Sequence, residues 1–459
     1  MLDAYTDHPS MSVPLPPELY YLGNFRTALA WVDERHADLL SDEESRFIAR
    51  FAELAVPAQA LLVRMVMRKG SHFRASKLRY DEIGDIAAAA RPLLELGWLS
   101  ERAPLEAAAV AALLRKDELL AHLPLADRRA SQKKAELEAQ LLALELPAQP
   151  FAAWCPNLDE RLYSLQVGEL CDRLRLLFFG NLSQDWSEFV LADLGIYRYE
   201  PVAIAPESRG FRCREDVDDY LFLRARRERF EAGEPVADLL EGLLDFASAN
   251  PYLQSRHARL LFRLAQQLEK DGEAEAALAL YRRSAHGEAR WRQIRVLEKL
   301  ERHSEAHALA VQLSASPGSD EEAQRLERAL PRLSRRLGLP APARRAAVAE
   351  CRSELVLPRP AHGSVEHAVR EHLHREQAPV HYVENTLLCS LFGLLCWPAI
   401  FAPLPGAFFH PFHSGPVDLY GSDFHERRRA LFDACLARLD DGSYRAHMRQ
   451  LHRTMFCTQ

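Results

Sequence analysis

Hydrophobic and polar positions recur with helical spacing along most of this chain. Between residues 238 and 337 apolar side chains return every three or four residues, as at Leu260, Leu264 and Leu268. That spacing places them on one face of an α-helix. Alternating patterns typical of strands are short and few by comparison. The pattern therefore predicts a mainly α protein.

The helices between residues 238 and 337 are expected to form an array of repeats. Their expected starts, about sixteen residues apart, lie near Arg256, Glu273, Glu288, Ser304 and Asp320. A pair of helices thus takes roughly the length of one tetratricopeptide repeat. Such an array offers a concave surface to a protein partner; alternatively, it is a scaffold that only spaces other parts. We assign it to a helical domain over residues 148–340.

Residues 1–103 have the pattern of a helix-turn-helix or winged-helix domain. Ser41 and Glu44 predict a capping box at a helix start. A second helix, an extended piece, a third helix and the brief strand GWLS follow. From Leu54 to Tyr80 there is no acid but there are six bases: Arg64, Arg68, Lys69, Arg74, Lys77 and Arg79. A window this basic in an acidic protein is a candidate phosphate-binding face, and the alternative is a solvated helix face.

Two further basic clusters follow. The first, in LADRRASQKKAELEAQLLAL, consists of Arg128, Arg129, Lys133 and Lys134. These bases precede a predicted helix, where positive charge opposes the helix dipole, so a bound phosphate would relieve repulsion. The second, in SRGFRCRED, consists of Arg209, Arg212 and Arg214. The first cluster, together with Arg209 and Arg212 of the second, is a candidate set of DNA contacts.

Aromatic residues are dense between residues 150 and 200. Aromatic rings could stack on nucleic-acid bases, but more often they pack in a core. We therefore assign four of them to the core: Phe178, Phe179, Trp186 and Phe189.

The composition argues against several classes of protein but does not identify the function. A chain of 459 residues is long enough for several domains, and a net charge of −7 argues against a uniformly basic nucleic-acid binder. The eight cysteines form no C-x-x-C pair, which argues against a zinc ribbon and suits a reducing compartment. The N-terminal MLDAYTDHPS is no signal peptide. The uncharged run from Asn385 to Phe409 is broken by prolines, so we expect a buried core helix and a loop, not a membrane span.

Two acids near the C-terminal end, Glu366 and Glu384, stand apart from the surface pattern. Glu384 comes just before the apolar run that begins at Leu387. A carboxylate this close to a buried helix face is costly unless something satisfies it. A metal ion would satisfy it; so would the free N–H groups of a helix N-terminus.

This region carries a family resemblance. The run VENTLLCSLFGLLCWPAIF, followed by PFHSGPVDLYGSDF, resembles the start of the nuclease domain of the Fanconi-associated nuclease family, which is of the VRR type. LRYDEIGDI, FFGNLSQDWSEFVLADLG and the helical repeats also match, so the resemblance covers most of the chain. It implies a SAP-like DNA-binding module over residues 104–147 and a partial α/β PD-(D/E)xK nuclease domain over residues 360–459.

The resemblance also implies a site and a function. Glu384 would bind Mg²⁺ or Mn²⁺, and His413 would be the polar catalytic residue before the PxDL segment. The reaction would be metal-assisted phosphodiester hydrolysis by a 5′ flap endonuclease and 5′–3′ exonuclease in interstrand crosslink repair. The partner would be branched or 5′-flap double-stranded DNA. The location would be the cytoplasm and nucleoid of a bacterium or the nucleus of a eukaryote.

The sequence departs from the family in one respect. The family completes its site with a G-x-P-D strand and an E-V-K strand after the helix at Glu384. This chain has no Pro-Asp dipeptide and no Glu-x-Lys triplet, and its last lysine is Lys299. We therefore expect a truncated piece with an incomplete site that does not itself cut DNA. The alternative is a non-catalytic DNA-binding scaffold.

A metal hydrolase built on histidines is a further alternative. Ten of the 18 histidines follow Ala361, and the candidate ligands are His367, Glu371, His374, His410 and His413. No H-E-x-x-H spacing occurs among them.

Overall fold

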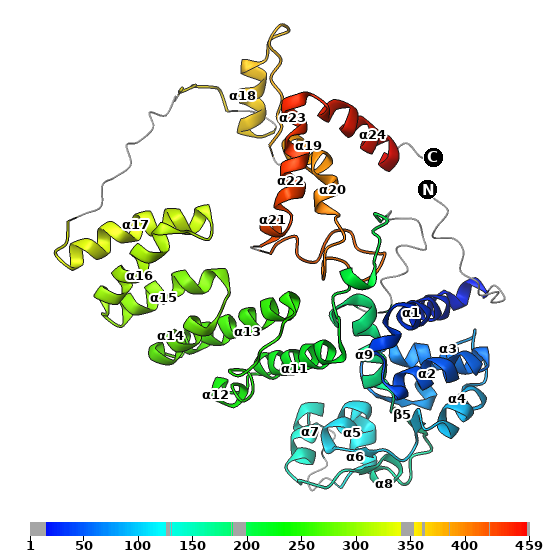
Figure 1. The fold of residues 1–459 in the computed structure, drawn as a ribbon. Coiled ribbons are helices and arrows are strands. Elements are labelled where there is room, and N and C mark those ends of the chain that lie inside the picture. The colour runs from blue at the N-terminus through cyan, green and yellow to red at the C-terminus, as the bar shows by residue number, and fades with distance from the viewer. Residues whose placement is uncertain are drawn as a thin grey trace. The chain divides into compact units, whose positions relative to one another are not determined.

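The computed structural model describes residues 15–124, 129, 131–184, 186, 199–340, 353–359, 363–384, 386–421 and 423–456. These residues fold mainly into helices, as predicted (Figure 1). They divide into two compact units: unit 1 comprises Met1–Val217 and Phe409–Ser414, and unit 2 comprises Asp218–Phe408 and Gly415–Gln459. Each unit is described by itself. Among the described helices, none is long and apolar enough to cross a membrane.

Unit 1 begins with a group of helices, most of which bury apolar side chains. They are η1 (Pro17–Leu19), α1 (Tyr20–His36), η2 (Ala37–Leu39), α2 (Asp42–Glu53), α3 (Val56–Val66), η3 (Ala75–Lys77) and α4 (Ile86–Glu95). At the start of α2, Ser41 Oγ accepts from the Glu44 N–H at 3.2 Å, and the Glu44 carboxylate accepts from the Ser41 N–H at 2.9 Å. The predicted capping box is therefore confirmed.

A three-stranded antiparallel sheet completes this helical domain. Its strands are β1 (His72–Arg74), β5 (Leu162–Leu165) and β2 (Leu99–Ser100), in the order β1-β5-β2. Phe73 pairs with Tyr163, and Leu99 pairs with Leu165. The strand predicted at GWLS is β2. The central strand β5 arrives from beyond the next module, so no local pattern could have placed it between the other two.

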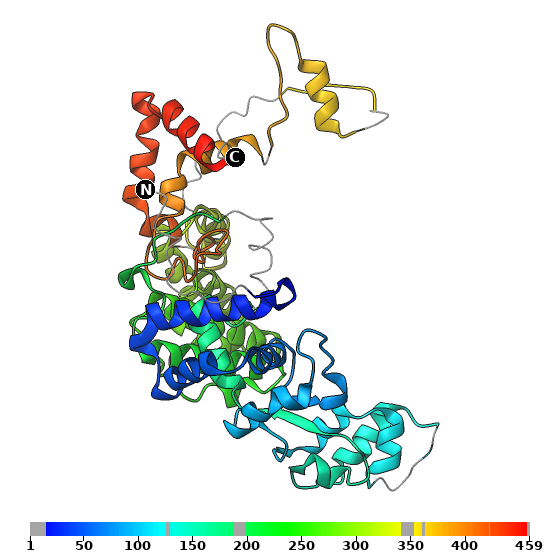
Figure 2. The ribbon, with the colours of Figure 1, turned by 90° about the vertical axis from the view of Figure 1, so that its right-hand side faces the viewer.

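That next module has its own small core. It contains β3 (Pro104–Leu105), α5 (Ala107–Leu113), α6 (Lys116–His122), α7 (Lys134–Leu142), β4 (Gln149–Pro150) and α8 (Phe151–Trp154). β3 pairs antiparallel with β4, and Trp154 Nε1 donates to the Leu105 carbonyl at 3.0 Å. Leu119, Leu137 and Leu141 are fully buried in this core. Figures 1 and 2 both show α1–α4 (blue) as one group and α5–α7 (cyan) as another.

The helix α9 (Gly168–Phe179) and the short η5 (Pro206–Ser208) complete the regular structure of unit 1. Phe178, Phe179 and Trp186 are buried, so these three aromatics belong to the core as predicted. Phe189 lies outside the described residues.

The segment Phe409–Ser414 packs within unit 1, although it comes from far along the chain. The ring of Phe409 lies against Gly180 and Gly210. A β-carbon at Gly180 would lie 2.2 Å from the ring and one at Gly210 would lie 2.0 Å from it. Gly180 also has φ +71°, which disfavours other residues. Both positions therefore require glycine for the ring to fit.

Unit 2 contains the array of helices. They are α11 (Arg214–Glu231), which starts in unit 1, α12 (Val236–Leu239), α13 (Pro251–Lys270), α14 (Ala274–Arg283), α15 (Gly287–Lys299), α16 (His303–Ala315) and α17 (Asp320–Arg336). From α13 to α17 each helix contacts the next (Figure 1). The last four begin within one residue of the predicted starts. The first begins five residues early, because Asn250 caps it and Pro251 occupies its first turn.

The C-terminal part of unit 2 is also helical. Its helices are α18 (Val365–Leu373), α19 (Leu387–Leu395), α20 (Trp397–Ile400), α21 (Phe424–Arg427), α22 (Arg429–Leu436), α23 (Arg438–Asp441) and α24 (Tyr444–Phe456). Among the described residues from 353 to 456 there is no strand, only an isolated bridge between Arg375 and Ala378.

The expectation of a buried core helix after Asn385 is wrong for most of α19. Its last residue, Leu395, joins a small core with Cys396, Ala399, Phe432 and Cys435. Toward its start, Leu387 is 47% exposed, Leu388 69% and Leu391 41%. The apolar composition predicts that a helix forms but not that its side chains are buried, because burial depends on which elements pack against the helix.

The Glu44 carboxylate forms ion pairs that link several helices of unit 1. Its side chain is fully buried, and it accepts hydrogen bonds from Arg173 Nε at 2.6 Å and from an Arg214 guanidinium nitrogen at 2.6 Å. Burial alone would raise the pKa of this carboxyl, but the hydrogen bonds from Arg214, Ser41 and Arg173 outweigh it and lower the pKa. One carboxylate thus joins α2 to α9 and to the start of α11.

We expect Glu44→Gln to destabilise unit 1 by about 3 kcal/mol, because removing one partner of a buried ion pair leaves uncompensated charge. Thermal unfolding followed by circular dichroism measures this. Glu43→Gln is the matched control, since its side chain is 69% exposed and exposed substitutions typically change stability by less than about 0.5 kcal/mol. Equal melting temperatures for the two variants would contradict the assignment.

Candidate functional site

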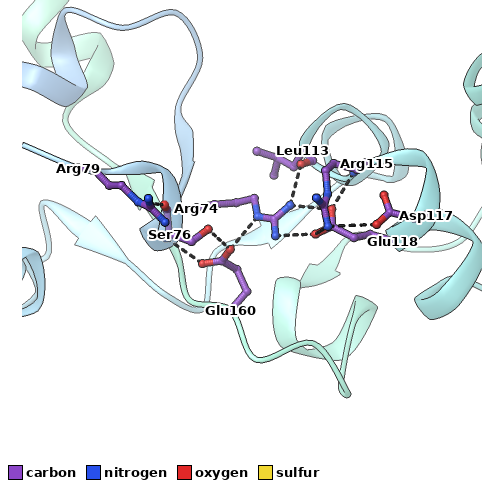
Figure 3. A network of polar contacts seen from close by, with 8 residues as sticks. All are labelled: Arg74, Ser76, Arg79, Leu113, Arg115, Asp117, Glu118 and Glu160. Atoms are coloured by element: carbon purple, nitrogen blue, oxygen red, sulfur yellow. Dashed lines mark hydrogen bonds and ion pairs between the residues drawn. The ribbon is translucent and has the colours of Figure 1, made fainter.

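Of the six bases in the acid-free window, Arg74 is buried and fully paired (Figure 3). Its guanidinium forms a two-pronged pair with Glu118 at 2.7 and 2.8 Å, and Arg74 Nε donates to Glu160 at 2.8 Å. Glu160 also accepts from the Ser76 N–H at 3.1 Å. Hydrogen bonding to Glu118, against the opposing effect of burial, raises the pKa of Arg74. This side chain joins the N-terminal domain to the α5–α7 module, and its charge is already matched by two carboxylates.

Arg64 is also largely occupied within the protein. It donates to Glu82 at 3.0 and 2.5 Å, and its guanidinium lies 4.0 Å from the ring centre of Tyr21. Burial would lower the pKa of Arg64, but hydrogen bonds to Glu82 and Tyr21 raise it. The side chain is 30% exposed, so Arg64 lies at the edge of the basic surface and not at its centre.

The other four bases of the window point to solvent: Arg68, Lys69, Lys77 and Arg79. Arg68 donates to Tyr80 Oη at 3.2 Å, and Arg79 donates to the Ser76 carbonyl at 3.2 Å. Neither contact neutralises charge. These four residues follow α3 and flank β1, and we call them the α3–β1 basic surface. Phosphate oxygens could replace water around these cations without breaking any described ion pair.

In the second cluster, Arg128 lies outside the described residues. Arg129 and Lys133 are exposed, and Lys134 pairs with Glu138 at 3.3 Å on the surface of α7. Lys133 is the N-cap of α7, and its N–H donates to Glu136 at 3.2 Å. The structure therefore has Lys133 and Lys134 at a helix start, as predicted. Glu136 offsets part of their charge at the helix dipole.

The third cluster serves mainly to hold unit 1 together. Arg209 forms a two-pronged pair with Asp38 at 2.6 and 2.8 Å and also donates to the Arg35 carbonyl at 2.8 Å. The hydrogen bond to Asp38 raises the pKa of Arg209, and the Arg209 guanidinium lowers the pKa of Asp38. Arg214 binds Glu44. Arg212 is the exposed member.

Glu384 is exposed and accepts a hydrogen bond from Tyr382 Oη at 2.8 Å. The helix-dipole alternative does not apply to it, because α19 begins at Leu387 with Thr386 as its N-cap. That alternative does fit Glu366, which lies in the first turn of α18. Hydrogen bonding to Ser364 lowers the pKa of Glu366. Glu384 therefore keeps a carboxylate open to solvent just before the apolar helix.

His413 lies in unit 1 and Glu384 in unit 2, so each is described separately. The ring centre of His413 lies 3.9 Å from that of His410 in a tilted arrangement, and the ring of His410 stacks on Phe178 with 5.2 Å between ring centres. Burial lowers the pKa of His413 to about 4, and burial together with the charge of His413 holds the pKa of His410 well below its usual range. Both rings are therefore neutral near pH 7. They anchor the Phe409–Ser414 segment.

A complete metal site is not present in the part of the chain that the structure describes. No group of three or more His, Cys, Asp or Glu side chains is arranged to hold an ion there. His374 Nδ1 accepts from the Val380 N–H at 3.1 Å, and His367 contacts Ser364 at 3.1 Å. Nothing therefore supports the histidine hydrolase. Glu384 alone does not fit Mg²⁺, which requires a near-octahedral set of oxygens.

The comparisons with known proteins identify the family. A model described as the FAN1 HTH domain matches residues 19–100, and one for the Fanconi anemia-associated nuclease SAP domain matches residues 104–154. The Fanconi-associated nuclease 1 homolog of Pseudomonas aeruginosa is 55% identical over 452 residues, which are 98% of this chain and 81% of that protein. The chain belongs to the Fanconi-associated nuclease 1 family.

Other relatives agree with this assignment. The Fanconi-associated nuclease 1 homolog of rice is 25% identical over 510 residues, covering 93% of this chain and 51% of that protein. A crystal structure of paFAN1 bound to DNA with a 2-nucleotide 5′ flap and a gap superposes with a TM-score of 0.83 at 55% identity. The match covers 97% of this chain and 82% of that one. The family is one of structure-specific nucleases, so this chain is a nuclease by family.

The sequence analysis missed one ionic contact that shapes the nuclease-like segment. Asp418, in the GPVDLY motif, accepts from the fully buried Arg428 at 2.7 and 2.9 Å and from Arg427 at 2.5 Å. Arg427 also donates to the Pro405 carbonyl at 2.6 Å. The ERRR run at residues 426–429 is the signal that could have indicated a paired guanidinium. Asp418 therefore serves to fold this segment in the described structure.

Glu118 makes the stability of unit 1 depend on pH. The hydrogen bond from Arg74 lowers the pKa of Glu118 from 4.5 to about 2. A carboxyl with a depressed folded-state pKa stabilises the fold above pH 4.5, and this contribution disappears as the pH falls toward 2. The size of this pKa shift corresponds to about 3 kcal/mol.

We expect Glu118→Gln to remove that stabilisation at pH 7 and to flatten the loss of stability below pH 4.5. Urea unfolding followed by tryptophan fluorescence at pH 7, 4 and 3 measures both effects. Asp117→Asn is the control, because its exposed carboxylate meets only Arg115, at 3.1 Å. Parallel pH curves for wild type and Glu118→Gln would show that the pair does not control acid stability.

Proposed function

We propose that this chain holds duplex DNA carrying a 5′ flap for a metal-dependent nuclease that acts in interstrand crosslink repair. One observation carries the proposal. The bases of the α3–β1 basic surface are exposed within an acid-free stretch, in a chain that is 55% identical to a protein solved with 5′-flap DNA. The alternative for this surface is a solvated face without a ligand.

The proposed interface consists of bases at the surface of unit 1, including Lys134, which pairs with Glu138 on the surface of α7. Arg68, Lys69, Lys77 and Arg79 form its main part, and Arg129, Lys133 and Lys134 extend it onto the α5–α7 module. Arg128, outside the described residues, and Arg212 remain predicted contacts. Arg74 and Arg209 are left out of the interface, because each is already neutralised by a carboxylate. Contacts of this kind position DNA without reading its sequence.

For the reaction we propose Glu384 as one ligand of Mg²⁺ or Mn²⁺. Its exposed carboxylate supports this role, but the described residues do not complete a metal site, and we derive no catalytic step from them. His413 remains a prediction from the family resemblance. Its buried neutral ring favours a part in holding the Phe409–Ser414 segment. Binding of a protein partner along α13–α17 and a location with chromosomal DNA also remain predictions.

DNA binding should be strongly salt-dependent. Each phosphate that is neutralised on duplex DNA contributes about 0.9 to the slope of log affinity against log salt. We expect Lys133→Ala with Lys134→Ala to lower that slope by up to about 1.8 and to weaken all duplexes about equally. Fluorescence anisotropy with labelled 5′-flap DNA between 50 and 300 mM salt measures it.

The matched control is Lys270→Ala with Lys299→Ala, which removes the same charge from α13 and α15. An unchanged slope in the Lys133/Lys134 variant would sink the proposal for the α7 start. A loss confined to one DNA sequence would also contradict it, because it would indicate base readout.

We further expect these 459 residues to bind flap DNA without cutting it, since only Glu384 is in place as a carboxylate of the expected metal site. A longer form that adds the G-x-P-D and E-V-K strands should cut. In that form Glu384→Gln should abolish cutting and leave DNA affinity nearly unchanged. Gel assays with Mg²⁺ and with Mn²⁺ measure both. Robust metal-dependent cleavage by residues 1–459 would refute this and would make His410→Ala and His413→Ala the next variants to measure.

A further inference from the structure

The helix α24 has two faces of opposite character. Tyr444 and Met448 pack against the small core that contains Leu395 and Phe432. Arg445, Arg449 and Arg453 follow one another at intervals of four residues and are all exposed. At about 1.5 Å of rise per residue, the three arginines form a stripe about 12 Å long along one side of the helix.

The charge of this stripe is not neutralised within the described part of the chain. Arg445 Nε donates to Tyr444 Oη at 3.0 Å, which leaves its charge unmatched. Arg449 and Arg453 form no ion pair or hydrogen bond with any described side chain, and residues 442–459 contain no acid. Elsewhere in unit 2 arginines typically meet carboxylates, as Arg302 meets Glu275 and Glu305. A row of like charges at this spacing repels itself unless an anion lies along it.

The position of α24 connects this charge to the proposed reaction. α24 contacts α19, and α19 begins three residues after Glu384. The apolar contacts of Tyr444 and Met448 fix which side of α24 faces the core, so the arginines face away from it. A polyanion on this side would lie on a helix that contacts α19, the helix that follows the proposed metal ligand.

We propose that the arginine stripe of α24 (red in Figure 1) binds the phosphate backbone of a DNA strand, as a second DNA contact separate from the α3–β1 basic surface. The proposal rests on the proposed function, since DNA is the polyanion that this family's reaction supplies. Guanidinium groups suit phosphate because each presents a planar fork of donors. The stripe would add affinity and hold the strand next to α19 without selecting a base sequence.

The test is the salt dependence of flap-DNA binding by the full 459-residue chain. We expect Arg449→Ala with Arg453→Ala to lower the log–log slope by up to about 1.8. Arg449→Lys with Arg453→Lys keeps the charge and should keep the slope. Arg429→Ala is the control, because Arg429 is 62% exposed but already pairs with Glu426. Its slope should match the wild type. Circular dichroism verifies that each variant is folded.

Two results would overturn the proposal, and they are distinguishable. If wild type binds flap DNA and Arg449→Ala with Arg453→Ala gives the wild-type slope, the stripe is not a DNA contact, whereas the proposed function stands. If the wild-type chain does not bind flap DNA at all, both the proposed function and the DNA contact at the arginine stripe are contradicted. A photo-crosslinking residue placed at position 453 gives an independent reading. It should label a DNA strand, and absence of label with bound DNA would contradict the stripe.

Discussion

The fold depends on ion pairs between buried or partly buried arginine side chains and carboxylates. Most of the 58 basic residues are arginines, and 65 acids accompany them. A guanidinium that is removed from water is stable only with a partner and satisfied hydrogen bonds. In unit 1 such pairs form at Glu44, which accepts hydrogen bonds from Arg173 and Arg214, and at Arg74, which bridges Glu118 and Glu160. In unit 2 such a pair forms between Asp418 and Arg428. These contacts fix the connections between helices that apolar cores alone would leave adjustable.

The same constraint separates structural from functional charge. Bases whose carboxylate partners lie within the fold are held there and stabilise it. Bases without such partners, such as Lys69 and Lys77, keep an unmatched charge at the surface. Their positions, not the net charge of −7, determine where a polyanion is attracted. An acidic protein can therefore carry local DNA-binding surfaces, and the family assignment gives those surfaces a substrate.

Local patterns in the sequence predicted where helices begin, but not which distant residues their side chains contact. The capping box at Ser41 and four of the five helix starts in the array follow from short-range rules, and the structure has them there. Arg74 stood among six bases with nothing nearby to distinguish it, because Glu118 and Glu160 lie 44 and 86 residues further along the chain. The exposure of Leu388 was missed for a related reason: composition shows that a helix is apolar but not what covers it. Glu384 stood out by its place before an apolar run, but only the family motif assigned it to a metal, since an exposed glutamate has no physical signature of its own.

Chemical labelling of the lysines tests the central claim most directly, because the chain has so few of them. Acetylation of each lysine, quantified by mass spectrometry with and without 5′-flap DNA, distinguishes surface charge that binds DNA from charge that does not. The account predicts protection of Lys69, Lys77, Lys133 and Lys134 and unchanged labelling of Lys270 and Lys299. Equal protection at all six positions, or none at the first four, would contradict it.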